Sequence, residues 1–250
     1  MSEVVLETHE GWAELILNRP ASRNAIDGPL GIRLAEQLEA LNDAPGIGAV
    51  LLRGAGGAFC SGLDLKQFNA DPAPAWLADF QSLWRRAHNA LYNLRPALVV
   101  AVDRYAINGG AALALAGDLL VMGETSFLHV GEVQQGMGAP YNMAWLRLRH
   151  SEAVTARVAL LGDRIDGPTA VGLGLATMSV GDDEVASQSR ALMEKLASYP
   201  PGALAHIKAT SARYRVGVTE NPANAGDDWF DRAFAVGPAP SQKPRANDPQ

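Results

Sequence analysis

Residues 97–117 read ALVVAVDRYAINGGAALALAG, and this stretch decides the class of fold. Ala97–Val102 is apolar and rich in β-branched residues, which is typical of a central strand that is buried on both faces. Gly109-Gly110 then begins a run of strong helix formers that extends to Gly117. Leu119–Met122 follows with the composition of another buried strand. The order strand, helix, strand predicts an α/β fold.

The segments before this stretch follow the same order. Val4–Thr8 and Trp12–Leu17 alternate around Glu10-Gly11, which predicts a β-hairpin. Apolar residues recur at helical spacing over residues 26–41, and Ala49–Arg53 has the composition of a short buried strand. The remaining expected elements before Pro140 are a helix over residues 76–91 and a short strand over residues 127–130.

Beyond Pro140 we expect helices joined by short connections rather than further sheet. The expected helices are Ala144–Leu148, Ala153–Leu161, Thr169–Gly172, Asp183–Leu196 and Pro201–Tyr214. Val236–Gln250 contains four prolines and almost no apolar periodicity, which predicts a disordered tail. The chain therefore divides into a core over residues 1–195, a helical region over 196–235 and a tail over 236–250.

Composition excludes several classes of function. The 250 residues carry 21 Lys and Arg against 27 Asp and Glu, and this acidic balance argues against a nucleic-acid or anionic-membrane partner. No apolar run reaches the eighteen residues that a membrane span requires. The single cysteine, Cys60, excludes an intramolecular disulfide, and the five histidines lack the close spacing of metal ligands. The first ten residues lack the pattern of a secretory signal, so we expect a cytoplasmic protein. From the cysteine and histidine content we expect no bound metal.

Glycines stand at two places where a strand passes into a helix, around Gly62 and at Gly109-Gly110. Backbone N–H groups in the first turn of a helix have no partner within the helix. They can therefore point at an anion or a developing oxyanion, helped by the helix dipole. Each loop taken alone is also explained by a tight turn. The phosphate-loop, dinucleotide-binding and nucleophile-elbow patterns are absent from the sequence, so Ser61 has no support as a nucleophile.

Three motifs occur along the chain in a defined order. They read LNRP at 17–20 with NAI at 24–26, FCSGLDL at 59–65, and AVDRYAINGG at 101–110, running on to Gly117-Asp118. From about Val4 to about residue 235 the chain thereby resembles the crotonase superfamily, also called the enoyl-CoA hydratase/isomerase family. The resemblance implies a crotonase (ClpP-like) spiral fold of repeated ββα units with a helical C-terminal layer, and chemistry on an acyl-CoA thioester.

The resemblance also implies which residues act. The backbone N–H groups of Leu63 and Gly109 would hold the thioester oxygen and stabilise an enolate, and donors of this kind are worth about 3–4 kcal/mol each in other enzymes. Lys66 would reach the CoA phosphates, although a solvated surface lysine is the simpler interpretation. The residues implied to bind CoA or the thioester are Arg23, Ala25, Ser61, Leu65, Lys66 and Gly110. Coenzyme A is part of the substrate, so no separate cofactor is implied.

The glutamates of family hydratases are only partly present. Two glutamates share the added water, and the first position, aligned through Asp118, is Ala112, which can neither hold water nor move a proton. Its loss removes much of the factor of about 10²–10⁴ that general acid–base catalysis supplies. Glu132 fits the second position because it lies four residues before Gly136. Counting forward from Phe127 instead reaches Gly131, so this alignment requires one inserted residue.

One carboxylate with an oxyanion hole is the family's usual arrangement for Δ3-Δ2-enoyl-CoA isomerases, in which a single base moves a proton from C2 to C4. We expect this activity, with Glu132 as the base and an apolar pocket raising its pKa. A hydratase or related lyase with a non-standard second acid is one alternative, and Asp64 is the nearest acid by motif, although it more simply caps its loop. An acyl-CoA-binding protein with weak catalysis is another. The candidate pocket walls, each equally explained as core, are Met137, Tyr141 and Trp145.

The C-terminal region differs from the family pattern. Family members commonly end in a helix followed by a basic segment that helps to cover CoA. Here Trp229–Phe234 is followed by Gly237-Pro238-Ala239-Pro240, and Lys243-Pro244-Arg245 is a candidate remnant. The helical region over 196–235 is implied to mediate assembly into a homotrimer, or a dimer of trimers, as in the family.

Overall fold

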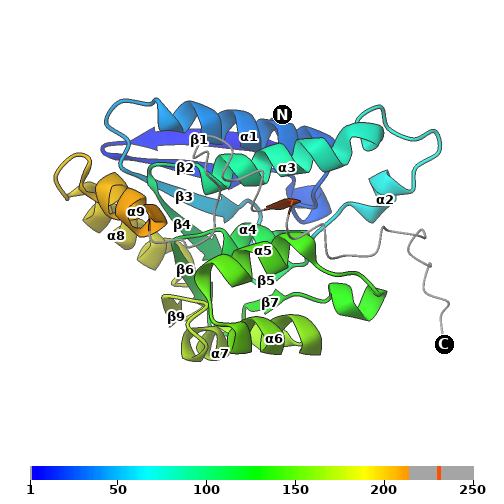
Figure 1. The fold of residues 1–250 in the computed structure, drawn as a ribbon. Coiled ribbons are helices and arrows are strands. Elements are labelled where there is room, and N and C mark those ends of the chain that lie inside the picture. The colour runs from blue at the N-terminus through cyan, green and yellow to red at the C-terminus, as the bar shows by residue number, and fades with distance from the viewer. Residues whose placement is uncertain (1, 214–229, 232–250) are drawn as a thin grey trace.

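The computed structural model describes residues 2–213, 230 and 231. Its main sheet has six strands in the order β1-β2-β3-β4-β6-β9 (Figure 1). The hairpin of the first two strands is antiparallel, and the other neighbouring strands are parallel. This confirms the predicted α/β class. The strands are β1 (Val4–His9), β2 (Trp12–Leu17), β3 (Ala49–Gly54), β4 (Ala97–Val102), β6 (Leu119–Gly123) and β9 (Met178–Val180).

Alternate side chains of the central strands enter two different cores. In β4, Leu98, Val100 and Val102 belong to the core that includes α1 (Gly28–Asn42), α3 (Phe80–Tyr92) and α4 (Gly109–Leu115). Val99 and Ala101 belong to the second core, which is closed by α8 (Val185–Ala197). Successive side chains of a strand point to opposite faces. Helices on both faces therefore explain why β4 is an unbroken apolar run.

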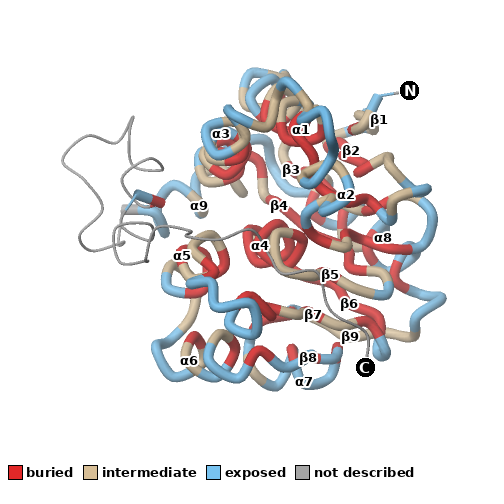
Figure 2. The backbone as a smooth tube through the Cα atoms, turned by 90° about the vertical axis from the view of Figure 1, so that its right-hand side faces the viewer, coloured by how far each residue is buried: buried red, intermediate tan, exposed pale blue. Residues whose placement is uncertain are grey.

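A second sheet of three short strands has the order β5-β7-β8, with β5 (Tyr105–Ile107), β7 (Phe127–His129) and β8 (Arg164–Asp166). The buried helix α4 lies in the middle of the molecule, close to β5 (Figure 2). α5 (Pro140–Arg149) packs against α4, and α6 (Glu152–Leu161) packs against α5. The central position of α4 puts its first turn, Gly109-Gly110, where several loops converge.

The expectation of helices alone after Pro140 is wrong in one respect. The helices are present, but β8 adds to the small sheet and β9 adds to the edge of the main sheet. Each of these strands has three residues, too few to show the alternating pattern by which a strand is recognised. The remaining elements are α2 (Leu65–Phe68), α7 (Gly167–Gly172), α9 (Ala203–Arg213) and the 3-10 turns η1 (Pro20–Ser22), η2 (Leu77–Asp79) and η3 (Glu132–Gln135).

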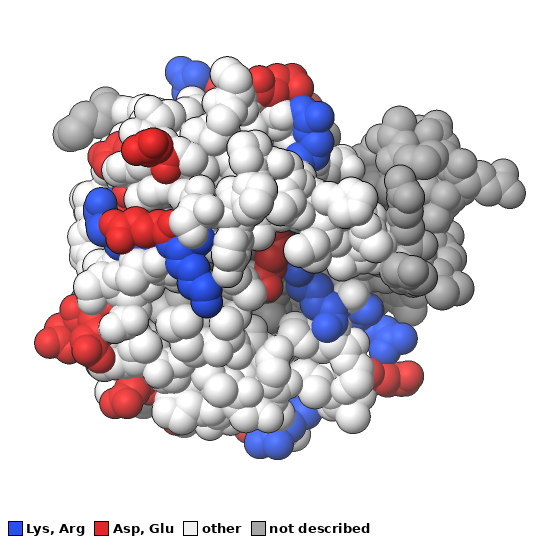
Figure 3. Space-filling model, turned by 90° about the vertical axis from the view of Figure 1, so that its left-hand side faces the viewer, with Lys and Arg blue, Asp and Glu red and all other residues white. Residues whose placement is uncertain are grey.

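Charged side chains of both signs are interspersed on the face shown in Figure 3. Within the described residues, every helix is too short or too polar to cross a membrane. The expected tail over 236–250, and residues 214–229 and 232–235 of the expected helical region, lie outside the described residues. The division into core, helical region and tail stays a prediction.

Candidate active site

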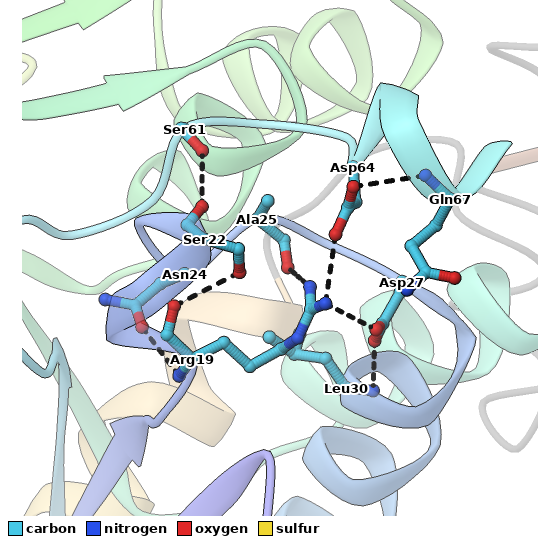
Figure 4. A network of polar contacts seen from close by, with 9 residues as sticks. All are labelled: Arg19, Ser22, Asn24, Ala25, Asp27, Leu30, Ser61, Asp64 and Gln67. Atoms are coloured by element: carbon cyan, nitrogen blue, oxygen red, sulfur yellow. Dashed lines mark hydrogen bonds and ion pairs between the residues drawn. The ribbon is translucent and has the colours of Figure 1, made fainter. Parts of the chain in front are cut away.

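Arg19, at the end of the first hairpin, joins two loops that are far apart in the sequence. Its Nη2 atom lies 2.9 Å from Asp27 Oδ2 and 2.9 Å from Asp64 Oδ2 (Figure 4). Its Nη1 atom donates a hydrogen bond to the carbonyl oxygen of Ala25. One guanidinium, with several donors in a planar fork, therefore fixes the segment before α1 against the segment before α2.

The two carboxylates that pair with Arg19 also cap helices. Asp27 accepts a hydrogen bond from Leu30 N (2.9 Å) at the start of α1, and Asp64 accepts one from Gln67 N (3.2 Å) at the start of α2. Burial raises the pKa of Asp27, and the Leu30 N–H and Arg19 partly offset this. Asp64 is thus a capping residue and an ion-pair partner, as the simpler of its two interpretations predicted.

Asn24 holds the turn after Arg19 against the glycine-rich loop that follows β3. Its fully buried side chain accepts from Arg19 N (2.8 Å) through Oδ1. Through Nδ2 it donates to the carbonyl oxygens of Ala55 (2.9 Å) and Ala58 (2.8 Å). Arg23 and Asn24 both have left-handed backbone, with φ of 56° and 55°. The asparagine is common in that conformation, and the arginine is held in it by its neighbours.

The residues implied to bind CoA come together along these two loops. Ser61 N donates to Arg23 O (3.1 Å), and Ser61 Oγ donates to Ser22 O (3.3 Å). Arg23, Leu65 and Lys66 are exposed at this surface, whereas Ala25 is buried. Exposed side chains and backbone from two loops form a surface that a large polar ligand can contact.

The two predicted oxyanion donors lie on loops that are hydrogen-bonded to each other. Cys60 N donates to Tyr105 O (3.2 Å), and Ile107 N donates to Cys60 O (3.1 Å). Leu63 lies three residues after Cys60, and Gly109, the first residue of α4, lies two residues after Ile107. Within residues 2–213, the backbone N–H groups of Leu63 and Gly109 donate no hydrogen bond. Both groups are therefore available to an oxyanion.

Gly110 is required by the closeness of these loops. A Cβ atom at Gly110 would lie 2.7 Å from the carbonyl oxygen of Cys60 and 2.9 Å from its Sγ atom. A side chain at this position would therefore push α4 away from the loop that carries Leu63. Gly110 acts through packing in this structure.

Glu132 is a buried carboxylate at the first residue of η3, with 8% of its surface exposed. Its Oε1 atom accepts from Asn142 Nδ2 (2.7 Å), and Oε2 has no hydrogen-bond partner within the described residues. Burial raises the pKa of Glu132, while its own backbone N–H and Asn142 partly offset this. A buried carboxylate with a raised pKa is suited to proton transfer near neutral pH.

Asn108 connects the loop of Glu132 to the second oxyanion loop. Asn108 N donates to His129 O (2.7 Å), and its Oδ1 accepts from Gly131 N (2.9 Å). Its φ of 49° is positive, which asparagine tolerates better than most residues. Sequence reasoning missed Asn108 and Asn142 as contributors. The position of Asn108 directly before Gly109-Gly110 was the one signal available.

Ala112 is the fourth residue of α4 and is fully buried. Its backbone N–H donates to Asn108 O (3.0 Å), so the residue is close to the loop just described. Its side chain is a methyl group, which contributes no acid or base.

The three candidate pocket walls differ in burial. Trp145 belongs to the core, Tyr141 is half-buried and Met137 is 41% exposed.

A possible set of metal ligands occurs elsewhere. Glu7, His9 and Glu14 on the first hairpin have ligand atoms within 4.8 Å of one another. Arg53 Nε already donates to Glu14 Oε1, and its positive charge disfavours a cation there. None of these residues belongs to the loops of the candidate site, and the expectation of a protein without a metal stays a prediction.

Comparisons with known proteins identify the family of this chain. The family model described as enoyl-CoA hydratase/isomerase matches residues 7–227. The chain is 31% identical over 206 residues to a carnitinyl-CoA dehydratase of Proteus mirabilis, covering 81% of this chain and 77% of that protein. It is 29% identical over 212 residues to the 1,2-epoxyphenylacetyl-CoA isomerase of Escherichia coli, covering 83% and 81%.

Solved structures show the same fold. An enoyl-CoA hydratase/isomerase from Mycobacterium paratuberculosis superposes with a TM-score of 0.78 at 26% identity, covering 94% of this chain and 92% of that chain. A carnitinyl-CoA dehydratase from Mycobacterium avium superposes with a TM-score of 0.80 at 25% identity, covering 94% and 90%. The fold is the crotonase fold, and the chain belongs to the enoyl-CoA hydratase/isomerase family.

Proposed function

We propose that this protein is an enzyme of the Δ3-Δ2-enoyl-CoA isomerase type, which acts on an acyl-CoA thioester through an enolate. The observation that carries the proposal is the pairing of one buried carboxylate, Glu132, with two free oxyanion donors, while Ala112 carries only a methyl group. A single base is sufficient for double-bond migration because no water has to be activated.

The proposed reaction uses these groups in turn. The Glu132 carboxylate removes a proton from C2 of a 3-enoyl thioester, and the C–H electron pair passes into the thioester carbonyl to form a dienolate. The N–H groups of Leu63 and Gly109 donate to the dienolate oxygen and stabilise its charge. The protonated Glu132 then returns the proton to C4, and the double bond lies between C2 and C3. Atoms and charge balance without a second acid.

The exposed loops supply the CoA surface in this proposal. Backbone at Arg23 and Ala25, with Ser61 and Leu65, would contact the nucleotide. Lys66 is exposed at the start of α2, so its ammonium group is free to approach a phosphate. We infer that the thioester then enters between Leu63 and Gly109.

Hydration is the second candidate function. The relative from Proteus mirabilis is named a dehydratase, and dehydration is the reverse of water addition. A hydratase would need a second acid, and Asp64 is engaged by Arg19 and by the cap of α2. Hydration would therefore require an acid that the described residues do not place beside Glu132.

The test is a parallel assay of the purified protein with 3-hexenoyl-CoA for double-bond migration and 2-hexenoyl-CoA for water addition. We expect migration to exceed hydration, and Glu132→Gln to abolish migration while thioester binding, measured by calorimetry, is retained. Glu152→Gln is the matched control because the Glu152 side chain is 89% exposed. Efficient hydration would favour the second candidate. Binding without either reaction would identify an acyl-CoA-binding protein.

Assembly and location complete the proposal. We infer a homotrimer, with pairing of trimers as the further possibility, and a cytoplasmic location. Sedimentation velocity tests the assembly, and a monomer at micromolar concentration would contradict it.

A further inference from the structure

Asn142 makes two hydrogen bonds through one amide group. Its Nδ2 atom donates to Glu132 Oε1 (2.7 Å) and to the carbonyl oxygen of Asn108 (3.0 Å). The side chain is 1% exposed and lies in the first turn of α5. The amide orientation follows from the chemistry of its partners, because Oδ1 in that place would face a carboxylate oxygen and a carbonyl oxygen.

The two acceptors belong to the two halves of the candidate site. Glu132 is the proposed base, and Asn108 directly precedes Gly109, whose N–H is a proposed oxyanion donor. Asn108 O also accepts from Ala112 N (3.0 Å), so this carbonyl is held by α4 as well. Asn142 thus hydrogen-bonds both the proposed base and the carbonyl group that precedes the proposed oxyanion donor.

The link distinguishes the two oxygens of Glu132. Oε1 is occupied by the Asn142 amide, whereas Oε2 is buried and has no partner within the described residues. The same Asn142 bond persists when Glu132 is protonated on Oε2, because a carboxylic acid keeps a carbonyl oxygen that accepts. Both protonation states of the base therefore fit the arrangement.

We propose that Asn142 is a positioning residue that fixes Oε2 of Glu132 as the proton-transferring atom and sets the distance from the base to the oxyanion donor. This inference rests on the proposed function. Asn142 does not contact the reacting atoms, and it acts through the orientation of Glu132 and of the Asn108 carbonyl.

Other titratable groups on the neighbouring elements are engaged elsewhere. His129 Nε2 lies 3.0 Å from Gly162 O, and Arg164 lies over the Phe127 ring. Arg149 pairs with Asp118, Arg147 pairs with Glu152, and Tyr141 interacts with Arg85. Burial raises the pKa of Glu132, its own backbone N–H and the Asn142 amide partly offset this, and no charged group is among the causes. Removal of the Asn142 donor should therefore be the main perturbation of this carboxylate in Asn142 variants.

The experiment measures the pH dependence of kcat/KM for migration of 3-hexenoyl-CoA. Asn142→Leu removes the donor at similar volume, and we expect kcat/KM to fall at least tenfold with KM changed less than threefold. Glu132 must be ionised to act as the base, and the Asn142 amide stabilises the ionised form. In Asn142→Leu the acidic limb of the pH profile should therefore move to higher pH. Asn142→Asp, with the same shape and an added carboxylate, should move that limb further. Arg147→Ala, on the exposed side of α5, is the control.

Melting temperature and circular dichroism of each variant separate positioning from misfolding. A structural role alone would lower the yield of folded enzyme without moving the acidic limb, and an unmoved limb in both folded variants would overturn the inference. If Asn142→Leu does not fold, the pH profile of Asn142→Asp alone tests the role of Asn142.

Glu132→Gln is assayed in the same experiment. Migration that survives Glu132→Gln would overturn the proposed function, and this inference with it, whereas an inactive Glu132→Gln with unmoved limbs would overturn only the role of Asn142.

Discussion

Gly62 packs directly against the carbonyl oxygen of Ile107, so that a Cβ atom at Gly62 would lie 2.9 Å from that oxygen. Gly62 also has a φ of +87°, a conformation that costs other residues about 1–2 kcal/mol. The loop that carries Leu63 therefore touches the loop that carries Gly109, and the glycine makes this contact possible.

Gly62→Ala should reduce activity through this contact. We expect the added methyl to move the Leu63 loop away from α4 and to lower kcat/KM for migration at least tenfold, because oxyanion donors act only at close range. Gly57→Ala is the matched control, since Gly57 has a similar φ of +72° and nothing within 4 Å of an added Cβ. Equal activity of the two variants would contradict the role of the loop contact.

Arg19→Leu should destabilise the protein strongly. The Arg19, Asp27 and Asp64 side chains are only 16%, 8% and 12% exposed, and removal of the arginine leaves two carboxylates without their partner. Loss of one partner from a buried pair costs about 3–5 kcal/mol, and the residual exposure places the expected loss near the lower figure. Urea unfolding of the wild type and of Arg19→Leu measures this loss of unfolding free energy.

The control for Arg19 is an exposed pair. Arg33→Leu removes the partner of Glu36, and both side chains are well exposed. Its expected effect is about 0–1 kcal/mol. Similar losses in Arg19→Leu and Arg33→Leu would show that the network in Figure 4 contributes little to stability.

Ala112→Glu should introduce hydration. The variant places a carboxylate on α4, next to Asn108, at the position that the resemblance assigns to the first glutamate of family hydratases. We expect hydration of 2-hexenoyl-CoA to rise at least tenfold over the wild type. The melting temperature should fall, because a charged group replaces a fully buried methyl. Ala112→Gln has the same size without the acid, and equal hydration by both variants would argue against acid–base catalysis at this position.

His88 should make stability dependent on pH. Its ring is fully buried, Nδ1 accepts from Trp145 Nε1 (2.9 Å), and burial lowers the pKa of His88 to about 3. The unfolded chain binds a proton at this residue below about pH 6.5, whereas the folded chain does not until about pH 3. The free energy of unfolding therefore falls as the pH falls through this window, with about 2 kcal/mol from His88 between pH 7 and pH 5.

His88→Asn keeps an acceptor for Trp145 and removes the titration. Urea unfolding at pH 7 and pH 5 should show a smaller loss of stability in this variant than in the wild type. His206→Asn, at an exposed position on α9, should leave the pH dependence unchanged. An equal loss of unfolding free energy between pH 7 and pH 5 in the wild type and in His88→Asn would contradict the assignment of this pH dependence to His88.

The sequence by itself determined the α/β class, the first hairpin, the long helices and strands, and the positions of the two glycine-rich loops. These features depend on the composition and spacing of neighbouring residues, such as the apolar run of β4 and the glycines before α4. The resemblance that places Leu63, Gly109, Ala112 and Glu132 in the family's site rests on such local motifs. Their roles stay predictions that the assays above test.

The tertiary structure alone decided how these segments meet. The strands β5, β8 and β9 have three residues each, and they form because neighbouring strands offer hydrogen-bond partners. The bonds of Asn142 to Glu132 and Asn108 span 10 and 34 residues, and the bond of Arg19 to Asp64 spans 45. No local pattern encodes such pairs, because a buried amide or guanidinium finds its partners only when packing of the apolar core brings distant loops together.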